Sequence, residues 1–163
     1  MTYSQKYAIV QFFEPVKEGY EFSMNEWPLH TTLADVFAVN LNQYLIDQLS
    51  SLLSTTETFE VVTQNDTILG TAENPVHVTL IEKTPKLQSL HDSLVNLLEK
   101  NGAVFNSPQY NHDGYLPHVT IQNQARINNS DVLKISKLSV IDLYVDGDWQ
   151  QREVVSSMKL LAK

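Results

Sequence analysis

The chain has 163 residues, of which 42% are hydrophobic and 18% charged, the composition of one soluble globular domain. Its formal net charge of −8 argues against a protein that coats long DNA or RNA, because such binding needs many Lys and Arg contacts to phosphates. With no cysteine present, disulfides, thiol nucleophiles and Cys-ligated zinc are excluded, so catalysis must use the five histidines or the carboxylates. No apolar run is long enough to span a bilayer and residues 1–6 lack a signal-peptide pattern, so we expect a cytoplasmic protein.

The first part of the chain predicts two strands and then a helix. Tyr7–Phe13 is β-branched and aromatic and predicts a buried strand, while residues 14–28 are typical of a loop. Leu29–Phe37 alternates with a period of two, which predicts a second strand. Asn40 is a candidate N-cap with Gln43 three residues later, and leucines then recur at helical spacing.

The middle of the chain predicts two further strands and a second helix. The strands are Thr58–Leu69 and Pro75–Ile81, separated by a polar turn that begins at Gly70. Thr84-Pro85 predicts a helix start with Thr as the cap, and Asn101-Gly102 predicts the end of that helix.

The last third is less regular. Residues 103–115 have the composition of a surface loop, residues 116–122 return to a strand pattern, and a helical turn is expected near Ser130. Asp146-Gly147 between two apolar runs predicts a β-hairpin. The two strands of this hairpin are Lys137–Val145 and Arg152–Leu160.

Three of the five histidines are followed at the second position by Thr and then by an apolar residue. The three motifs are His30-Thr31-Thr32-Leu33, His77-Val78-Thr79-Leu80 and His118-Val119-Thr120-Ile121. On a strand, residues i and i+2 point the same way, so each motif places an imidazole beside a hydroxyl. Two facing pairs would form a phosphate site in which the hydroxyls bind non-bridging oxygens and the imidazoles act as acid and base. Pattern alone does not choose the two motifs, because the strands with His30 and His77 are each followed by a capped helix.

The first and third motifs carry a resemblance to a known family. Pro28-Leu29-His30-Thr31-Thr32-Leu33 and Leu116-Pro117-His118-Val119-Thr120-Ile121, with 88 residues separating the histidines, resemble the paired motifs of the two-histidine (2H) phosphoesterase superfamily. That superfamily includes the 2′-5′ RNA ligase-like proteins and the RNA 2′,3′-cyclic phosphodiesterases. The resemblance implies an α+β fold of two pseudo-symmetric lobes with antiparallel sheets, helices on their outer faces and a central cleft, intertwined in one domain over residues 1–163.

The resemblance also implies an activity and roles for the motif residues. It implies a metal-independent phosphodiesterase without a cofactor, acting on a 2′,3′-cyclic phosphate or a 2′-5′ linkage of a nucleotide or short RNA. His30 would be the general acid, His118 the base, and Thr32 and Thr120 would bind the phosphate. We expect the protein to be a monomer that binds neither long DNA nor a membrane.

Several other residues are candidates for substrate contacts. Tyr110 and Tyr115 border the His118 motif and could stack on a base, although anchoring of the loop is the simpler role. Trp27 and Phe37 flank the first motif, where aromatic side chains usually belong to the core. Arg126 follows the His118 motif, but it lies farther from that motif than the arginine often found in RNA ligase-like relatives. Lys83, Lys86 and Arg152 are further candidate phosphate contacts, each more often a solvated surface charge.

Two alternatives belong to other functional classes. One is a nucleotide or RNA-end binding module that keeps the phosphate pocket without turnover. The other is a metal-dependent phosphohydrolase that uses His77, His91-Asp92 or His112-Asp113. We interpret these three sites as structural: His77 as a strand residue that neighbours the cleft or pairs with a backbone group, His91 as an edge of the helix stripe, and His112-Asp113 as loop residues.

Overall fold

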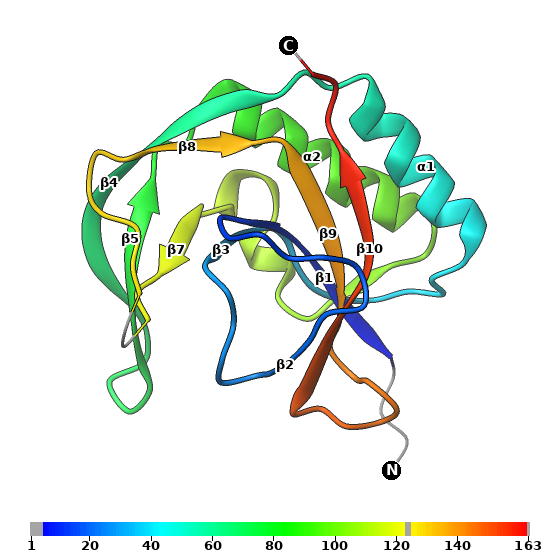
Figure 1. Ribbon diagram of the computed structural model, residues 1–163, viewed down its shortest axis with the longest axis horizontal. Helices are drawn as coiled ribbons and strands as arrows, with labels where there is room; N and C mark the ends of the chain where they lie inside the picture. The colour runs from blue at the N-terminus through cyan, green and yellow to red at the C-terminus, as the bar shows by residue number, and fades with distance from the viewer. Residues whose placement is uncertain (1–4, 123–124, 163) are drawn as a thin grey trace.

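The computed structural model describes residues 5–122 and 125–162, and Figure 1 shows its strands curving around two helices. The strands are β1 Lys6–Phe12, β2 Glu21–Ser23, β3 His30–Ala38, β4 Phe59–Gly70, β5 Pro75–Ile81, β6 Val104–Phe105, β7 His118–Thr120, β8 Val132–Ile135, β9 Lys137–Asp142 and β10 Gln151–Lys159. The helices are α1 Gln43–Ser54 and α2 Pro85–Lys100, with short 3-10 turns at Pro108–Tyr110 and His112–Gly114. None of the helices in these ranges is long and apolar enough to cross a membrane.

The strands form one antiparallel sheet in the order β2-β10-β9-β1-β3-β7-β5-β4-β8, with β6 paired to β3. The α+β class with antiparallel strands is therefore confirmed. The two halves of the sheet meet where β3 and β7 pair through Thr31 and Val119, so the expected pair of sheets is joined into a continuous one. This junction lies between the two histidine motifs that carry the family resemblance.

Both helices contribute to one apolar core. α1 packs against β10, α2 packs against β3, and the two helices also touch each other. Their leucines meet residues of β3, β8 and β9 such as Leu33, Ile135 and Leu138, which are fully buried. A smaller cluster that includes Phe12, Phe22 and Val154 is covered by the segment between β1 and β3. β3 is therefore held by packing on both sides, which fixes the strand that carries His30.

Local sequence signals placed α2 and the last hairpin correctly. The Thr84 side chain accepts a hydrogen bond from the amide of Leu87 and caps α2, as predicted. Asp146 and Gly147 have φ values of 52° and 81°, as in the turn that matches the twist of a two-residue hairpin. β9 and β10 pair across this turn, which confirms the hairpin.

Three local expectations were wrong. α1 is capped by Asn42, whose side chain accepts from the Leu45 amide, and not by Asn40. The segment near Ser130 forms a turn with φ 64° that leads into strand β8 instead of a helical turn. The loop over residues 14–28 contains the short edge strand β2, which pairs with β10. In each case a tertiary partner, or a competing polar residue two positions away, decided between similar local signals.

Candidate functional site

The pairing of β3 with β7 brings the first and third histidine motifs together. Thr31 and Val119 are opposite each other in an antiparallel register and both are buried on the core side. Their neighbours therefore point to the other face, where His30 lies beside Thr120 and His118 lies beside Thr32. Each imidazole thus has the hydroxyl of its own motif along the strand and that of the other motif across the strands. We call these four side chains the His/Thr quartet.

The two imidazoles are oriented by matching hydrogen bonds. Nδ1 of His30 lies 2.8 Å from the carbonyl oxygen of Pro28, and Nδ1 of His118 lies 2.7 Å from that of Leu116. Each carbonyl belongs to the residue two positions before the histidine. Because a carbonyl oxygen can only accept, each Nδ1 carries a hydrogen, and the neutral ring keeps its lone pair on Nε2. Both rings therefore offer Nε2 for proton transfer.

His30 lies in an aromatic environment. Its ring centroid is 4.6 Å from that of Trp27 and 6.1 Å from that of Phe12. Burial lowers the pKa of His30; the hydrogen bond to Pro28 opposes this effect, and the nearby His118 lowers the pKa further. The electrostatic influence of His118 on His30 is the effect expected of two histidines that face one site. In the unliganded protein His30 is therefore held toward its neutral form.

A cavity of about 560 Å³ opens beside the quartet. Thr32 and His118 form one end, and the residues at the end of β4, Ile68 and Gly70, form part of the rim. Tyr110 also lines the cavity and is 57% exposed, which leaves its ring free to contact a ligand. The cavity has the volume and the mixed polar and apolar lining typical of a small-molecule site.

Tyr115 lines the same cavity but is built into its wall. Its ring stacks on that of His91 with centroids 3.9 Å apart and an interplanar angle of 1°. Its hydroxyl donates to the carbonyl oxygen of Thr32, and burial raises its pKa. The ring that could have stacked on a base is thus committed to His91, and Tyr115 anchors the loop before the His118 motif.

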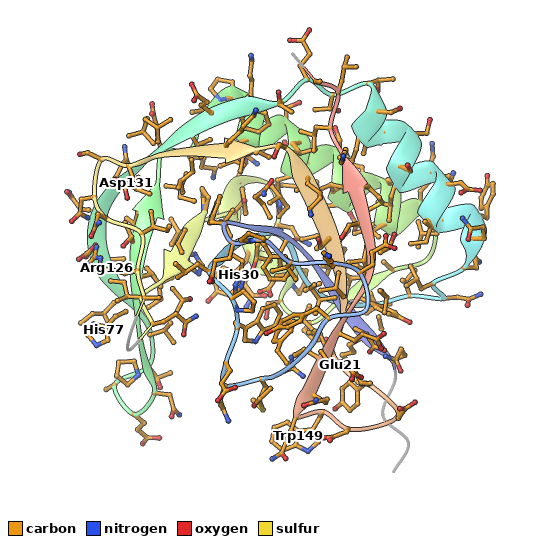
Figure 2. The ribbon with its side chains drawn as sticks, viewed as in Figure 1. Glu21, His30, His77, Arg126, Asp131 and Trp149 are labelled. Carbon is orange, nitrogen blue, oxygen red and sulfur yellow. The ribbon has the colours of Figure 1, made fainter. Side chains whose placement is uncertain are left out.

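The His77 motif lies on the other face of the sheet. β5 pairs with β7 so that Thr79 is opposite Val119, and His77, two residues from Thr79, shares its face. Figure 2 shows His77 at the outer edge of the molecule, apart from His30. The Thr79 hydroxyl donates to Asp66 at 3.0 Å, so this motif serves the pairing of β4 with β5. Of the two roles expected for His77, the position beside the cleft is wrong, because the strand register turns its side chain away.

Two residues proposed as substrate contacts lie elsewhere. Phe37 is 1% exposed and packs against Tyr7 and Phe105 in the core, so it cannot bind substrate. Arg126 donates to both carboxylate oxygens of Asp66, at 3.1 and 2.9 Å, on the face of the sheet opposite the quartet. Figure 2 shows Arg126 on the same outer side as His77. Both expectations are corrected.

The remaining basic candidates also have other contacts. Lys83 donates from Nζ to the carbonyl oxygen of Asp113, and Arg152 donates to the carbonyls of Leu143 and Trp149. Lys86 lines a different cavity, at the bend between β8 and β9. None of the three lines the cavity beside the quartet.

The histidines of the metal-dependent alternative have protein partners. Nδ1 of His91 lies 2.6 Å from the carbonyl oxygen of Leu33, and its Nε2 accepts from the His112 amide at 2.9 Å. Nδ1 of His112 lies 3.0 Å from Asp92. Among residues 5–122 and 125–162, no group of three His, Asp or Glu side chains has the arrangement of a metal site. His91 and His112 thus tie α2 to β3 and to the loop before β7, which agrees with a structural role.

Sequence reasoning missed the wall formed by His91 and the rim at the end of β4. The relevant signal for the rim was an aliphatic residue, Ile68, just before the turn at Gly70; its side chain is 60% exposed. For His91 the signal was a polar residue inside the leucine stripe of α2, where it is 1% exposed. A polar group buried so completely needs partners, and here they are backbone groups that flank the quartet.

Comparisons with known proteins identify the family and the fold. The family model of the 2′-5′ RNA ligase superfamily matches residues 6–146. A search of curated proteins found no match. Solved structures with the same fold include TT0787 of Thermus thermophilus, with 13% identity, TM-score 0.59, and 97% of this chain and 99% of that chain covered. Escherichia coli LigT complexed with NADP+ has 13% identity, TM-score 0.56, and coverage of 97% of this chain and 98% of LigT. A further structure described as a phosphoesterase has 13% identity and TM-score 0.56, with 98% of this chain and 99% of that chain covered.

Proposed function

The chain belongs to the 2′-5′ RNA ligase superfamily, and on that premise we propose that it is a phosphodiesterase that works without a metal. Its substrate is a 2′,3′-cyclic phosphate or a 2′-5′ phosphodiester of a nucleotide or short RNA. His30 and His118 are the acid-base pair, and Thr32 and Thr120 bind the phosphate. The observation that carries this proposal is the His/Thr quartet, with both Nδ1 atoms tied to backbone carbonyls and both Nε2 atoms available.

The reaction follows from this geometry. The phosphate lies between the two rings, with its non-bridging oxygens accepting hydrogen bonds from the threonine hydroxyls. The neutral imidazole takes a proton from water as the water oxygen attacks phosphorus. The protonated imidazole gives a proton to the leaving sugar oxygen as its bond to phosphorus breaks. The products are a phosphate monoester and a free hydroxyl, and one exchange of protons with solvent restores the pair.

The cavity beside the quartet supports a nucleotide as the substrate. His118, Thr32 and Tyr110 line the same cavity, so a nucleotide whose phosphate is held by the quartet would share this cavity with the Tyr110 ring. Structures of E. coli LigT are described as complexes with NADP+, 3′-AMP, ATP and phosphate, which supports a ligand of this class here. Aromatic faces bind bases with little sequence preference, so the site favours a chemical end over a base sequence.

Hydrolysis assays with EDTA present test the proposal. The purified protein is incubated with 2′,3′-cyclic nucleotides, 2′-5′ oligoadenylate and RNA that ends in a cyclic phosphate, and the product isomers are separated. His30→Ala and His118→Ala should each lower the rate by on the order of 10² to 10⁴. His77→Ala is the matched control, because it removes the same motif residue from the opposite face and should leave the rate unchanged.

Three results would each contradict the proposal. Full activity in either quartet variant would remove the histidine from the mechanism. Loss of activity with EDTA, restored by a divalent ion, would favour the metal-dependent alternative. Binding of the cyclic nucleotide with no product after long incubation would favour the non-catalytic binding module.

A further inference from the structure

A second cavity, of about 830 Å³, lies at the bend where β8 continues into β9. Figure 1 shows this bend next to the end of β10 and the start of β4. The Gln11 side chain fixes the bend, because its Oε1 accepts hydrogen bonds from the amides of Ser136 and Lys137 at 2.8 and 3.0 Å. Its Nε2 donates to the carbonyl oxygen of Phe12, so all the polar atoms of this buried side chain have partners. The cavity is therefore framed by well-fixed backbone.

Lysines are concentrated in this cavity. Four of its 14 lining residues are Lys86, Lys134, Lys137 and Lys159. The whole chain has nine lysines among 163 residues, so a lining of this size would contain about one by chance. We call these four residues the lysine groove.

The positive charge in the groove exceeds the negative charge. In the described part of the chain, none of the four ammonium groups forms an ion pair with a carboxylate. The lining also holds two carboxylates, Glu60 and Glu14, the second of which accepts a hydrogen bond from the amide of Leu29, so four cations face two anions. Four like charges around one cavity repel one another unless an anion is bound between them. In a chain with a net charge of −8, this placement favours a negatively charged ligand.

The groove is separate from the catalytic cavity. On β1 the Phe12 side chain lies on the His30 side, with the two rings 6.1 Å apart, whereas the neighbouring Gln11 points to the other face, toward Ser136. The two cavities have no lining residue in common. An anion in the lysine groove would therefore leave the His/Thr quartet free.

The lining indicates which kind of anion fits. Of its aromatic residues, Phe59 is buried, Phe12 turns its ring to the opposite face beside His30, and Phe13 is partly buried against the core, so the lining offers no fully open ring for a base. Recognition must therefore depend on charge, and several ammonium groups around one cavity suit a ligand with several adjacent phosphates. We propose that the lysine groove is a second anion site, for a compact polyphosphate.

Titration calorimetry of the full chain with inorganic tripolyphosphate tests this site. The double variant Lys134→Gln/Lys159→Gln should weaken binding about tenfold or more, because two cations that contact the ligand are removed. The control Lys17→Gln/Lys100→Gln changes the net charge equally at exposed lysines outside the groove, and it should change affinity less than twofold. Circular dichroism checks that both double variants remain folded.

The outcomes separate this site from the catalytic one. The proposal would be overturned if both double variants bound tripolyphosphate equally weakly, or if the groove variant kept the affinity of the parent. It would also be overturned if the parent did not bind tripolyphosphate at millimolar concentration. A parallel titration with an eight-residue oligothymidylate tests the ligand class. If the protein bound this oligonucleotide but not tripolyphosphate, the proposed class of a compact polyphosphate would be wrong. Hydrolysis by the groove variant should equal that of the parent, and the binding result stands whether or not hydrolysis is found.

Discussion

Two adjacent threonines in the first motif face opposite sides of β3. The Thr31 hydroxyl donates to the carbonyl oxygen of His118 at 2.8 Å, so it holds the two motif strands together. Thr32 points to the other face, into the cavity beside His118. One residue along the strand thus separates a hydroxyl that joins the two strands from one that lines the cavity.

Replacing each threonine by valine should separate these two roles. Thr31→Val removes a buried hydrogen bond and should lower the free energy of unfolding by about 1 kcal/mol. Thr32→Val should leave stability nearly unchanged and slow hydrolysis by roughly 10², because it removes a donor to the phosphate. Urea unfolding and initial rates measure the two effects. A Thr32→Val protein with unaltered kinetics would show that this hydroxyl does not contact the phosphate.

The acid and base roles of the two histidines can be assigned by the choice of leaving group. The family resemblance makes His30 the acid, whereas its lowered pKa in the unliganded protein favours the neutral form that a base needs. A bound phosphodiester carries negative charge, which would raise the pKa of His30 toward the acid form. The resemblance therefore requires that substrate binding protonate His30.

With a p-nitrophenyl phosphodiester, departure of the leaving group needs no proton. If His30 is the acid, His30→Ala should lose far less activity on this ester than on a cyclic nucleotide, while His118→Ala should be impaired equally on both. Initial rates on the two substrates give the comparison. The opposite pattern would exchange the roles, and equal losses in both variants on both substrates would contradict a division of labour.

At the scale of elements, α2 and the loop before β7 hold β3 in place through one stacked pair. The His91 ring donates to the carbonyl oxygen of Leu33, and Tyr115, stacked on it, donates to that of Thr32. These two carbonyls lie on β3 just after the site where it pairs with β7. Beyond the short pairing with β7, these two backbone carbonyls of β3 are therefore hydrogen-bonded by side chains.

Tyr115→Phe tests this contact with a minimal change. It keeps the ring stacked on His91 and removes the hydroxyl, leaving the Thr32 carbonyl without that donor, so the free energy of unfolding should fall by about 1 kcal/mol. Because β3 carries His30 and Thr32, kcat should also fall while KM changes little. Tyr110→Phe, an exposed ring on the same cavity, is the control for stability. Identical unfolding curves for Tyr115→Phe and the parent would show that the hydroxyl contributes nothing.

How much of the structure could be predicted from sequence depended on the range of the signal. The Thr84-Pro85 cap and the Asp146-Gly147 turn act within a few residues, and both were predicted correctly. The choice among three histidine motifs was different, because a one-residue shift of register moves a side chain to the other face. His77 and His118 have the same local pattern, and only the pairing of β5 with β7 separates them. The family resemblance supplied the information that local patterns lack.

The lysine groove shows the same limit over a longer range. Its lysines come from α2, β8, β9 and β10, and each is an ordinary surface charge in the sequence. Only the bend between β8 and β9, held by Gln11 from β1, brings them to one cavity. No spacing rule along the chain would have found this cluster.

At the scale of the whole molecule, two buried histidines link folding to pH. Burial is the main cause of the lowered pKa of both His30 and His91. Each is neutral in the folded protein at a pH where it would begin to bind a proton in the unfolded chain, whose reference pKa is about 6.5. The unfolded state therefore binds more protons below that pH, and stability falls as the pH decreases.

The sign of this effect gives a definite stability profile. The contribution of the two histidines is fully present above about pH 7 and is lost as the pH falls through the lowered pKa values of the folded state. A second loss follows at lower pH, because the hydrogen bonds from Arg126 hold the pKa of Asp66 at about 2, below its ordinary value of 3.8.

His91→Gln isolates the contribution of the core histidine. An amide cannot be protonated in this range, yet it retains a donor and an acceptor near the two backbone partners of His91. The variant should be less stable than the parent at pH 8, and the difference should shrink toward pH 5 because only the parent loses stability there through His91. His77→Gln changes an exposed histidine and should follow the parent throughout. Urea midpoints at half-unit pH steps give the comparison, and a difference that stays constant from pH 8 to pH 5 would show that His91 is not protonated on unfolding in this range.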